Sequence, residues 1–299
     1  MNPLKIDFLG ITFPNPVIIA SGPFNFGREY AHLYPLSSLG AVTTPSIYHR
    51  ALDGYPTPRI TETPMGMLNA IGPENKGVDA YVADELPWLK KQGARVIVNI
   101  CGEKPADFAY VAKKVVPFAS MIEVNLACPS SNGQSLSAHD AQLAAEIIAL
   151  VKSVTCLPVL AKLSPNDFLL PIAKALEEAG VDGYSLINPL PGMRIDIERK
   201  RPVLSKRQGG LSGPAIKPVA ISMINKLYQH TRLPILGMGG ISNHEDALEF
   251  ALAGSRLIAV GTALFADPYI PIKIIQALQK YFLTQNETWR SWVELATPH

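Results

Sequence analysis

Short runs of apolar and β-branched residues recur along the chain, and a helical pattern follows each of them. Within a run the apolar residues are continuous instead of alternating with polar ones, which is typical of parallel strands covered on both faces. The pattern therefore predicts eight buried strands. They lie at residues 17–22, 40–46, 95–102, 121–129, 157–163, 183–188, 233–240 and 257–263.

Amphipathic segments with helical spacing separate these runs, and several of them end in glycine. Gly93, Gly180 and Gly254 are predicted to lie just past a helix end, where left-handed backbone is common. Eight strands that alternate with eight helices indicate an α/β fold, the (β/α)8 TIM barrel. An open doubly wound sheet is the alternative, but the GxGxxG motif usual after its first strand is absent.

Three stretches exceed the minimal barrel. Residues 5–17 predict an N-terminal β-hairpin that turns near Gly10 and plugs the barrel bottom. Residues 47–75 and 189–213 form long loops after strands two and six, on the face where such barrels build their sites. The proline content of the first loop indicates a stiff segment, not a lid. No repeat or linker interrupts the pattern, so we expect one domain over residues 1–299.

Composition narrows the function classes. The chain is 47% hydrophobic and 17% charged with a formal net charge of +2, which favours neither nucleic acid nor an anionic membrane. Three cysteines without a CxxC motif do not form a disulfide framework. The N-terminus lacks a targeting pattern and no apolar run reaches the length of a membrane span. We expect a cytoplasmic protein.

Residues at the carboxyl ends of the strands face the active site of a TIM barrel. Here they are rich in amides and glycines, and the six histidines are scattered without a metal-ligand spacing, so no metal is expected. Such a set suits a flat, polar, anionic ligand, for which a flavin is the natural candidate. The strand-end residues are Ser21, Gly22, Thr44, Asn99, Asn125, Cys128, Lys162, Asn188, Gly239, Gly240, Gly261 and Thr262.

The last two strands end in glycine-rich segments. Barrels commonly bind phosphate through the loops after strands seven and eight, so Gly239, Gly240, Gly261 and Thr262 are predicted to hold a phosphate. These glycines could instead only turn the chain. Lys162 lies in an apolar run, where a cation is costly to bury unless it meets an anion or an electron-rich ring such as flavin. The alternative is a lysine exposed at the strand end.

Cys128 ends the fourth strand beside Asn125, and a thiol there could serve as general acid or base. The alternative is a buried, inert thiol, an interpretation that fits Cys101 and Cys156 better. Three asparagines stand at loop or strand ends and could recognise the imide edge of a pyrimidine, although asparagine is also an ordinary turn residue. These are Asn69, Asn125 and Asn188.

Eight motifs along nearly the whole chain resemble the dihydroorotate dehydrogenases, in the same order. They are IASGPF, GYPTPRITETPMGMLNAIGPENKG, VNLACP, AKLSPN, LINPLPGM, GGLSGPAIKP, LGMGGI and AVGTALF. LNAIG and GGLSGPAIKP are most similar to the NAD-linked class 1B branch. The resemblance implies an FMN-containing barrel that oxidises dihydroorotate to orotate in pyrimidine biosynthesis. It further implies a homodimeric core and a separate subunit that carries FAD and a 2Fe–2S cluster.

The resemblance also implies roles for residues. Cys128 is the base that removes the proton from C5 of dihydroorotate while hydride passes from C6 to flavin N5. The substrate is bound by Asn69, Gly72, Asn125 and Asn188. FMN is bound by Ala20, Ser21, Gly22, Thr44, Asn99, Asn125, Lys162, Ile187, Gly213, Gly239, Gly240, Gly261 and Thr262.

Four positions depart from the family pattern. Pro45 replaces a lysine near flavin and substrate, Pro73 replaces a leucine, and Pro189 replaces Ser or Thr. The family's Ser-Cys-Pro-Asn becomes Ala127, Cys128, Pro129 and Ser130. Because cation and hydrogen-bond partners are lost, we expect weaker orotate binding unless Arg194 or another loop residue substitutes.

Three functions remain open from the sequence. The first is a class 1B dihydroorotate dehydrogenase with a repacked pocket. The second is a paralogous FMN oxidoreductase that acts on a different, neutral dihydropyrimidine-like or C=C substrate. The third is a non-catalytic flavin-binding or partner protein, which the presence of Cys128 and Lys162 disfavours.

Overall fold

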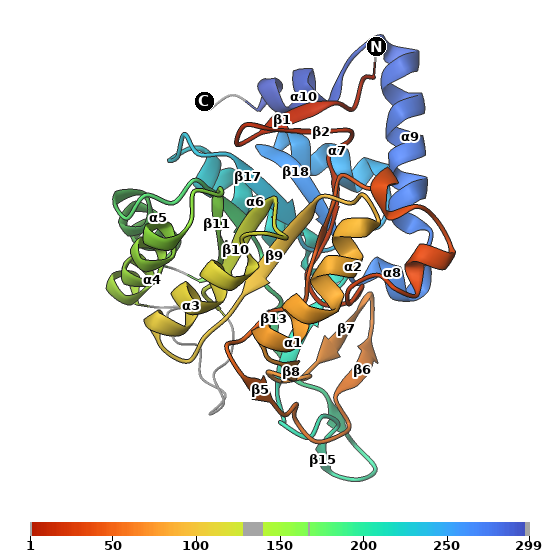
Figure 1. Ribbon diagram of the computed structural model, residues 1–299. Helices are drawn as coiled ribbons and strands as arrows, with labels where there is room; N and C mark the ends of the chain where they lie inside the picture. The colour runs from red at the N-terminus through yellow and green to blue at the C-terminus, as the bar shows by residue number, and fades with distance from the viewer. Residues whose placement is uncertain (1, 128–139, 167, 297–299) are drawn as a thin grey trace.

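The computed structural model describes residues 2–127, 140–166 and 168–296. Eight parallel strands hydrogen-bond in chain order and close into a barrel, which confirms the predicted TIM barrel (Figure 1). Seven of the strands lie inside the predicted runs, and the eighth begins two residues earlier. They are β3 (Val17–Ile19), β4 (Ala41–Thr43), β9 (Val96–Ile100), β10 (Met121–Asn125), β11 (Val159–Leu163), β12 (Gly183–Leu186), β17 (Ile235–Met238) and β18 (Ser255–Val260).

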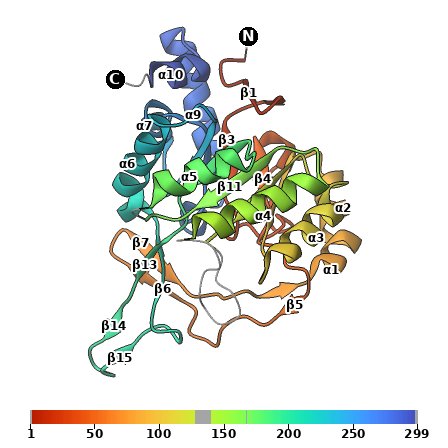
Figure 2. The same ribbon diagram turned by 90° about the vertical axis from the view of Figure 1, so that its left-hand side faces the viewer.

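Helices cover the outside of this barrel, as Figures 1 and 2 show. Every residue of β9, β10 and β11 is buried because the helices cover one face of these strands and the barrel interior the other. Among the described residues, no helix is long and apolar enough to cross a membrane. The helices are α1 (Val78–Ala83), α2 (Glu85–Lys91), α3 (Pro105–Val115), α4 (Ala141–Val154), α5 (Leu169–Glu178), α6 (Lys217–Tyr228), α7 (His244–Leu252), α8 (Ala263–Ala266), α9 (Ile270–Gln285) and α10 (Trp289–Leu295).

The prediction of a helix after every barrel strand is wrong for the first strand. Between β3 and β4 the chain forms two 3-10 helices, η1 (Tyr30–His32) and η2 (Leu36–Ser38), and no α-helix in this fully described segment. Pro23, Gly27 and Pro35 interrupt the segment, so no helical run of useful length can form.

Three helices end at the predicted glycines. Gly93, Gly180 and Gly254 have φ angles of 70°, 85° and 110°, and each lies two residues past the end of α2, α5 or α7. This is the left-handed position that terminates many helices and that a side chain disfavours.

We expect Gly254→Ala to destabilise the protein more than Gly180→Ala. A Cβ on Gly180 would have no neighbour within 4 Å, so only backbone strain of about 1–2 kcal/mol is expected there. A Cβ on Gly254 would lie 2.3 Å from Cγ of Tyr228 and adds a steric clash. Urea unfolding of both variants measures the difference, and equal midpoints would contradict it.

The N-terminal hairpin forms as predicted. Strands β1 (Ile6–Phe8) and β2 (Ile11–Phe13) pair antiparallel around a turn at Leu9 and Gly10, both with positive φ. The side chain of Leu9 lies against Gly183, the first residue of β12, where its Cδ1 is 3.5 Å from the position of an added Cβ. The hairpin therefore packs against the amino-terminal end of the barrel, opposite the predicted site.

The two long loops lie where the sequence predicts, but they contain strands, four of which form one sheet shared by both loops. After β4 come β5 (Ala51–Leu52), β6 (Ile60–Thr63), β7 (Gly66–Asn69) and β8 (Asn75–Lys76). After β12 come β13 (Leu190–Gly192), β14 (Ile195–Asp196), β15 (Arg201–Pro202), β16 (Gly209–Ser212) and the 3-10 helix η3 (Pro214–Ile216). The order β13-β16-β7-β6 joins the loops through β7 and β16, where Leu68 pairs with Leu211. Figure 2 shows this sheet below the barrel, with β14 and β15 projecting from it.

Candidate functional site

A cavity of about 1020 Å³ opens at the carboxyl ends of the barrel strands, where the two long loops meet. Residues far apart in the sequence converge on it, and most of the predicted site residues are among them. The predicted residues that line the cavity are Ala20, Ser21, Gly22, Asn69, Gly72, Asn125, Lys162, Ile187, Asn188, Gly213, Gly239, Gly240, Gly261 and Thr262.

Two predicted residues lie behind the cavity wall, and one lies outside the described residues. Thr44 and Asn99 are fully buried and do not line the cavity. The Thr44 hydroxyl accepts a bond from the Asn99 main-chain N–H at 3.1 Å and donates to the Pro45 carbonyl at 2.9 Å. Cys128 belongs to residues 128–139, which the structure does not describe.

Lys162 meets an anion, as a buried cation requires, but the anion is a residue that the sequence reasoning missed. The Lys162 ammonium lies 3.4 Å from Oε1 of Glu123, whose side chain is completely buried in β10. Oε2 of Glu123 has no hydrogen-bond partner in the described part of the chain. Since an isolated buried charge is strongly destabilised, each group supplies the counter-charge that the other requires inside the barrel.

Glu123 and Lys162 form one end of a chain of hydrogen-bonded side chains. The Asn99 amide donates to Glu123 Oε1 at 2.5 Å, and the Ser46 hydroxyl donates to Asn99 Oδ1 at 2.6 Å. The Asn125 amide then donates to Ser46 Oγ at 3.3 Å, and the Asn188 amide donates to Asn125 Oδ1 at 3.0 Å. This chain connects the predicted flavin cation to two of the three predicted substrate amides.

The sequence contains a signal for Glu123 that strand periodicity makes visible. Glu123 stands two residues before Asn125 in the same strand, so both side chains face the same side of the sheet. In the register, Glu123 lies opposite Asn99 and Asn125 opposite Lys162. No comparable signal exists for Ser46, which reaches the chain only because the segment after β4 crosses toward β9 and β10.

Gly239 and Gly240 follow β17, and Gly261 follows β18; together they are called the glycine loop. These glycines supply unused main-chain donors. Their N–H groups, with that of Thr262, donate no hydrogen bond to the described residues although they border the cavity. A Cβ on Gly240 would lie 2.8 Å from Cβ of Lys217, so no larger residue fits there. Hydrogen bonds to the Asp246 and Glu249 carboxylates raise the pKa of Lys217 and hold its side chain in place. Free N–H groups on a tightly packed glycine loop suit a phosphate.

Several prolines lie in the part of the cavity that the sequence predicts to hold the substrate. Pro45, Pro73 and Pro189, three of the four departures from the family pattern, all line the cavity and offer it no N–H donor. Ser130, the fourth, lies outside the described residues. Arg194 does not line the cavity, because its guanidinium is bound to Thr61 Oγ1 and the Glu62 carbonyl.

Two further cations line the same end of the cavity, and the sequence reasoning did not single them out. Arg59 precedes β6 and donates to the Tyr55 carbonyl and the Glu74 carboxylate. Lys76, at the end of β8, also contributes to the lining. Burial raises the pKa of the neighbouring Tyr81 hydroxyl, so this group stays neutral and accepts a bond from the Lys76 main-chain N–H.

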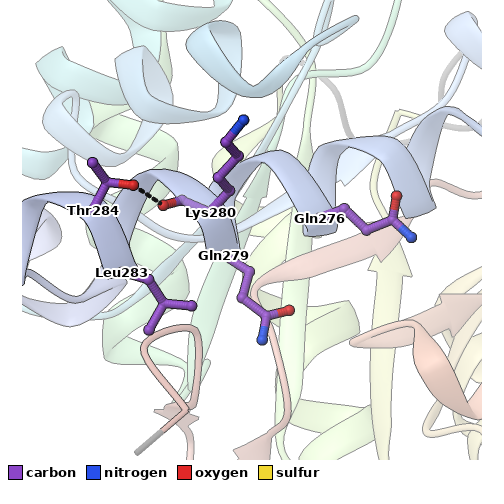
Figure 3. Close-up of a pocket in the computed structure, with 5 residues that line it drawn as sticks. All are labelled: Gln276, Gln279, Lys280, Leu283 and Thr284. Carbon is purple, nitrogen blue, oxygen red and sulfur yellow. Dashed lines mark hydrogen bonds between the residues drawn. The ribbon is translucent and has the colours of Figure 1, made fainter.

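A second hollow, of about 460 Å³, lies on the outer surface of α9. Figure 3 shows the side chains that line it, all of which belong to successive turns of this one helix. Lys280 and Leu283 are among them. Among the described residues only α9 lines this hollow, whereas both long loops and the barrel strands line the cavity at the strand ends. The latter is therefore the candidate site.

These features define a class: an α/β barrel whose strand-end cavity is bordered by glycines with unused main-chain donors, a buried cation and side-chain amides. Comparison with known proteins makes the class specific. The family model for dihydroorotate dehydrogenase matches residues 3–282.

Relatives with the same description are similar along nearly their whole length. The dihydroorotate dehydrogenase B (NAD(+)) catalytic subunit of Bacillus cereus strain G9842 is 45% identical over 93% of this chain and 91% of its own. That of Anoxybacillus flavithermus is 46% identical over 93% of this chain and 90% of its own. The crystal structure of DHODH from Eimeria tenella in complex with ferulenol superimposes with a TM-score of 0.81 at 21% identity, covering 99% of this chain and 89% of that one, and supports the fold.

The chain belongs to the dihydroorotate dehydrogenase family. It is therefore an oxidoreductase of the type that acts on CH–CH groups, in a family of pyrimidine biosynthesis. Membership of this family implies a flavin cofactor, and the free N–H groups of the glycine loop and the buried Lys162 fit such a group.

Proposed function

We propose that this protein is the catalytic subunit of an NAD-linked dihydroorotate dehydrogenase and that its cofactor is FMN. The observation that supports this most directly is the convergence of Lys162, Asn125, Asn188 and the glycine loop on one cavity. The names of the relatives at 45–46% identity point to the same reaction. In this proposal residues 1–299 act as one FMN-binding domain.

The phosphate of FMN would be held by the main-chain N–H groups of Gly239, Gly240, Gly261 and Thr262, with Gly213 beside them. Ala20, Ser21, Gly22 and Ile187 would border the ring system, and Lys162 would lie at its electron-rich edge. Thr44 and Asn99 would act from behind the wall by fixing the residues that face the cavity. When bound, the flavin supplies the two-electron acceptor for the hydride that leaves C6.

On the substrate side, Asn69, Gly72, Asn125 and Asn188 would hold the pyrimidine ring. Cys128 would remove the proton from C5, so that loss of a proton and a hydride converts the C5–C6 single bond into the double bond of orotate. The electrons would then pass to a separate subunit that carries FAD and a 2Fe–2S cluster. The term "catalytic subunit" in the relatives' names supports such a partner. We further propose a homodimeric core in the cytoplasm.

We expect anaerobic addition of dihydroorotate to the purified protein to bleach the visible flavin band. Proton and hydride leave the substrate in this half-reaction, which needs no partner subunit. Stopped-flow absorbance measures its rate. A flavin that stays oxidised with dihydroorotate would contradict the proposed substrate but leave the family and fold intact.

A second candidate function is supported by the prolines at positions 45, 73 and 189. Of the cations lining the described cavity, Lys162 and Arg59 are already paired with Glu123 and Glu74, so a substrate carboxylate finds few free donors. A neutral ring such as dihydrouracil carries no carboxylate and therefore requires no free cation. Bleaching by dihydrouracil but not dihydroorotate would favour this alternative, and Pro45→Lys should then raise the affinity for orotate.

A further inference from the structure

The hydrogen-bonded side chains that run from Glu123 through Asn99, Ser46 and Asn125 to Asn188 are called the amide chain. Two groups in contact with its amides have only one possible hydrogen-bonding role. The Glu123 carboxylate, balanced by Lys162 at 3.4 Å, can only accept. The main-chain N–H of Ala127, which lies 3.3 Å from Asn125 Oδ1, can only donate. These two groups stand at opposite ends of the stretch between Asn99 and Asn125, and they determine which way every amide between them points.

From the Glu123 end, the direction follows bond by bond. Because Glu123 accepts, Asn99 turns its NH2 toward the carboxylate and its Oδ1 toward Ser46. The single hydroxyl proton of Ser46 is used in the bond to Asn99, so toward Asn125 the Ser46 oxygen can only accept. Asn125 therefore directs its NH2 to Ser46 and its Oδ1 away from it.

The Ala127 end gives the same direction independently. Asn125 Oδ1 accepts the Ala127 N–H and also the Asn188 NH2, at 3.3 and 3.0 Å. Both interactions require the oxygen of Asn125 on that side. All three amides consequently point their NH2 groups toward Glu123, although they lie on β9, on β10 and after β12.

These directions define which hydrogen-bonding groups of Asn125 and Asn188 remain available to a ligand. Asn125 keeps one N–H, and Asn188 keeps its Oδ1, which no donor in the described part of the chain reaches, together with one N–H. Both residues line the cavity. A donor beside an acceptor is the complement of an amide edge, a carbonyl next to a ring N–H.

We propose that Glu123 is a positioning residue that, through Asn99 and Ser46, fixes the direction of Asn125 and Asn188 and so selects ligands with a ring N–H next to a carbonyl. Its side chain is completely buried and does not line the cavity, so it acts only through this series of hydrogen bonds. The proposal rests on the proposed function for its ligand class, a cyclic amide, and applies equally to a charged or a neutral one.

A simpler role for Glu123 is that of counter-charge to Lys162, and Ser46 separates the two roles. Ser46→Ala breaks the chain between Asn99 and Asn125 but leaves the Lys162–Glu123 pair intact. Glu123→Gln keeps the shape of the side chain and removes both its charge and its single role, since a carboxamide can donate as well as accept.

The test uses the flavin-loaded protein and two probes, orotate and uracil, titrated against the visible flavin spectrum. We expect Ser46→Ala and Glu123→Gln each to weaken binding by about tenfold or more, since an amide without its fixed partner leaves buried polar groups unpaired. The flavin reduction potential should rise in Glu123→Gln, which loses a negative charge beside Lys162, and stay unchanged in Ser46→Ala. Ser255→Ala, which removes a buried hydroxyl at the opposite end of the barrel in β18, is the matched control and should change neither quantity.

Unchanged ligand affinity in Ser46→Ala, with a shifted potential in Glu123→Gln, would overturn the proposal and leave Glu123 as a counter-charge only. Failure of the wild-type protein to bind either probe would also overturn it, because the fixed amide pair would then recognise no cyclic amide. Failure of the proposed function gives a different result. In that case Ser46→Ala would still weaken the binding of uracil, whereas dihydroorotate would leave the flavin of the wild-type protein oxidised.

Discussion

Replacing Cys128 with alanine is expected to slow flavin reduction by dihydroorotate by about 10²–10⁴-fold, the usual contribution of a positioned general base. The substitution removes the only proposed acceptor for the C5 proton. It removes none of the groups proposed to hold FMN, so the protein should remain yellow. Anaerobic stopped-flow measurement of the flavin band gives the rate directly.

The matched control for this experiment is Cys156→Ala. Cys156 is exposed and follows α4 on the way into β11, at the end of the barrel away from the cavity. Its removal should leave the reduction rate unchanged. A Cys128→Ala protein that is reduced at the wild-type rate would remove this thiol from the mechanism and assign the proton to another group.

Lys162→Met is expected to lower the free energy of unfolding by about 3–5 kcal/mol, because it leaves the fully buried Glu123 carboxylate without a counter-charge. Methionine is similar in length to lysine, so little packing is lost. Urea unfolding followed by circular dichroism measures the change. The double variant Lys162→Met/Glu123→Gln should recover most of the loss, because no charge then remains buried.

An exposed ion pair provides the comparison. Lys152 and Asp182 lie 2.7 Å apart outside the barrel, each about 30% exposed, and Lys152→Met should cost at most about 1 kcal/mol. If Lys162→Met were no more destabilising than Lys152→Met, the buried pair of Lys162 and Glu123 would contribute no more to stability than an exposed ion pair.

The barrel was predictable because its strands and helix ends are local features. The apolar runs around Val96 and Val159 have no alternative to burial on both faces, and Gly180 and Gly254 stand where a helix must stop. The exception, the helix expected after β3, was wrong because prolines and a glycine interrupt that segment. The apolar residues of that segment pack into the core from 3-10 helices and turns instead of from a regular α-helix.

The position at the strand ends and the family motifs predicted that the glycine loop, Lys162 and the three asparagines share one site, and all of them line one cavity. The same rule could not separate residues that face the cavity from those one layer behind it. Thr44 and Asn99 were assigned to the cofactor directly, yet their side chains bond to other protein groups within the wall. The closing of the barrel determines that layer.

The sequence by itself determined the fold class, the end of the barrel that carries the site and most of the residues that line it, because strand period, glycine backbone and burial of apolar runs depend on neighbours in the chain. Only the tertiary structure decided that the two long loops share a sheet through Leu68 and Leu211, and that Glu123 and Ser46 join the amides. Those contacts join residues tens to more than a hundred positions apart. Their geometry exists only once the barrel has closed, since closure places the buried carboxylate of Glu123 beside Lys162, which balances its charge.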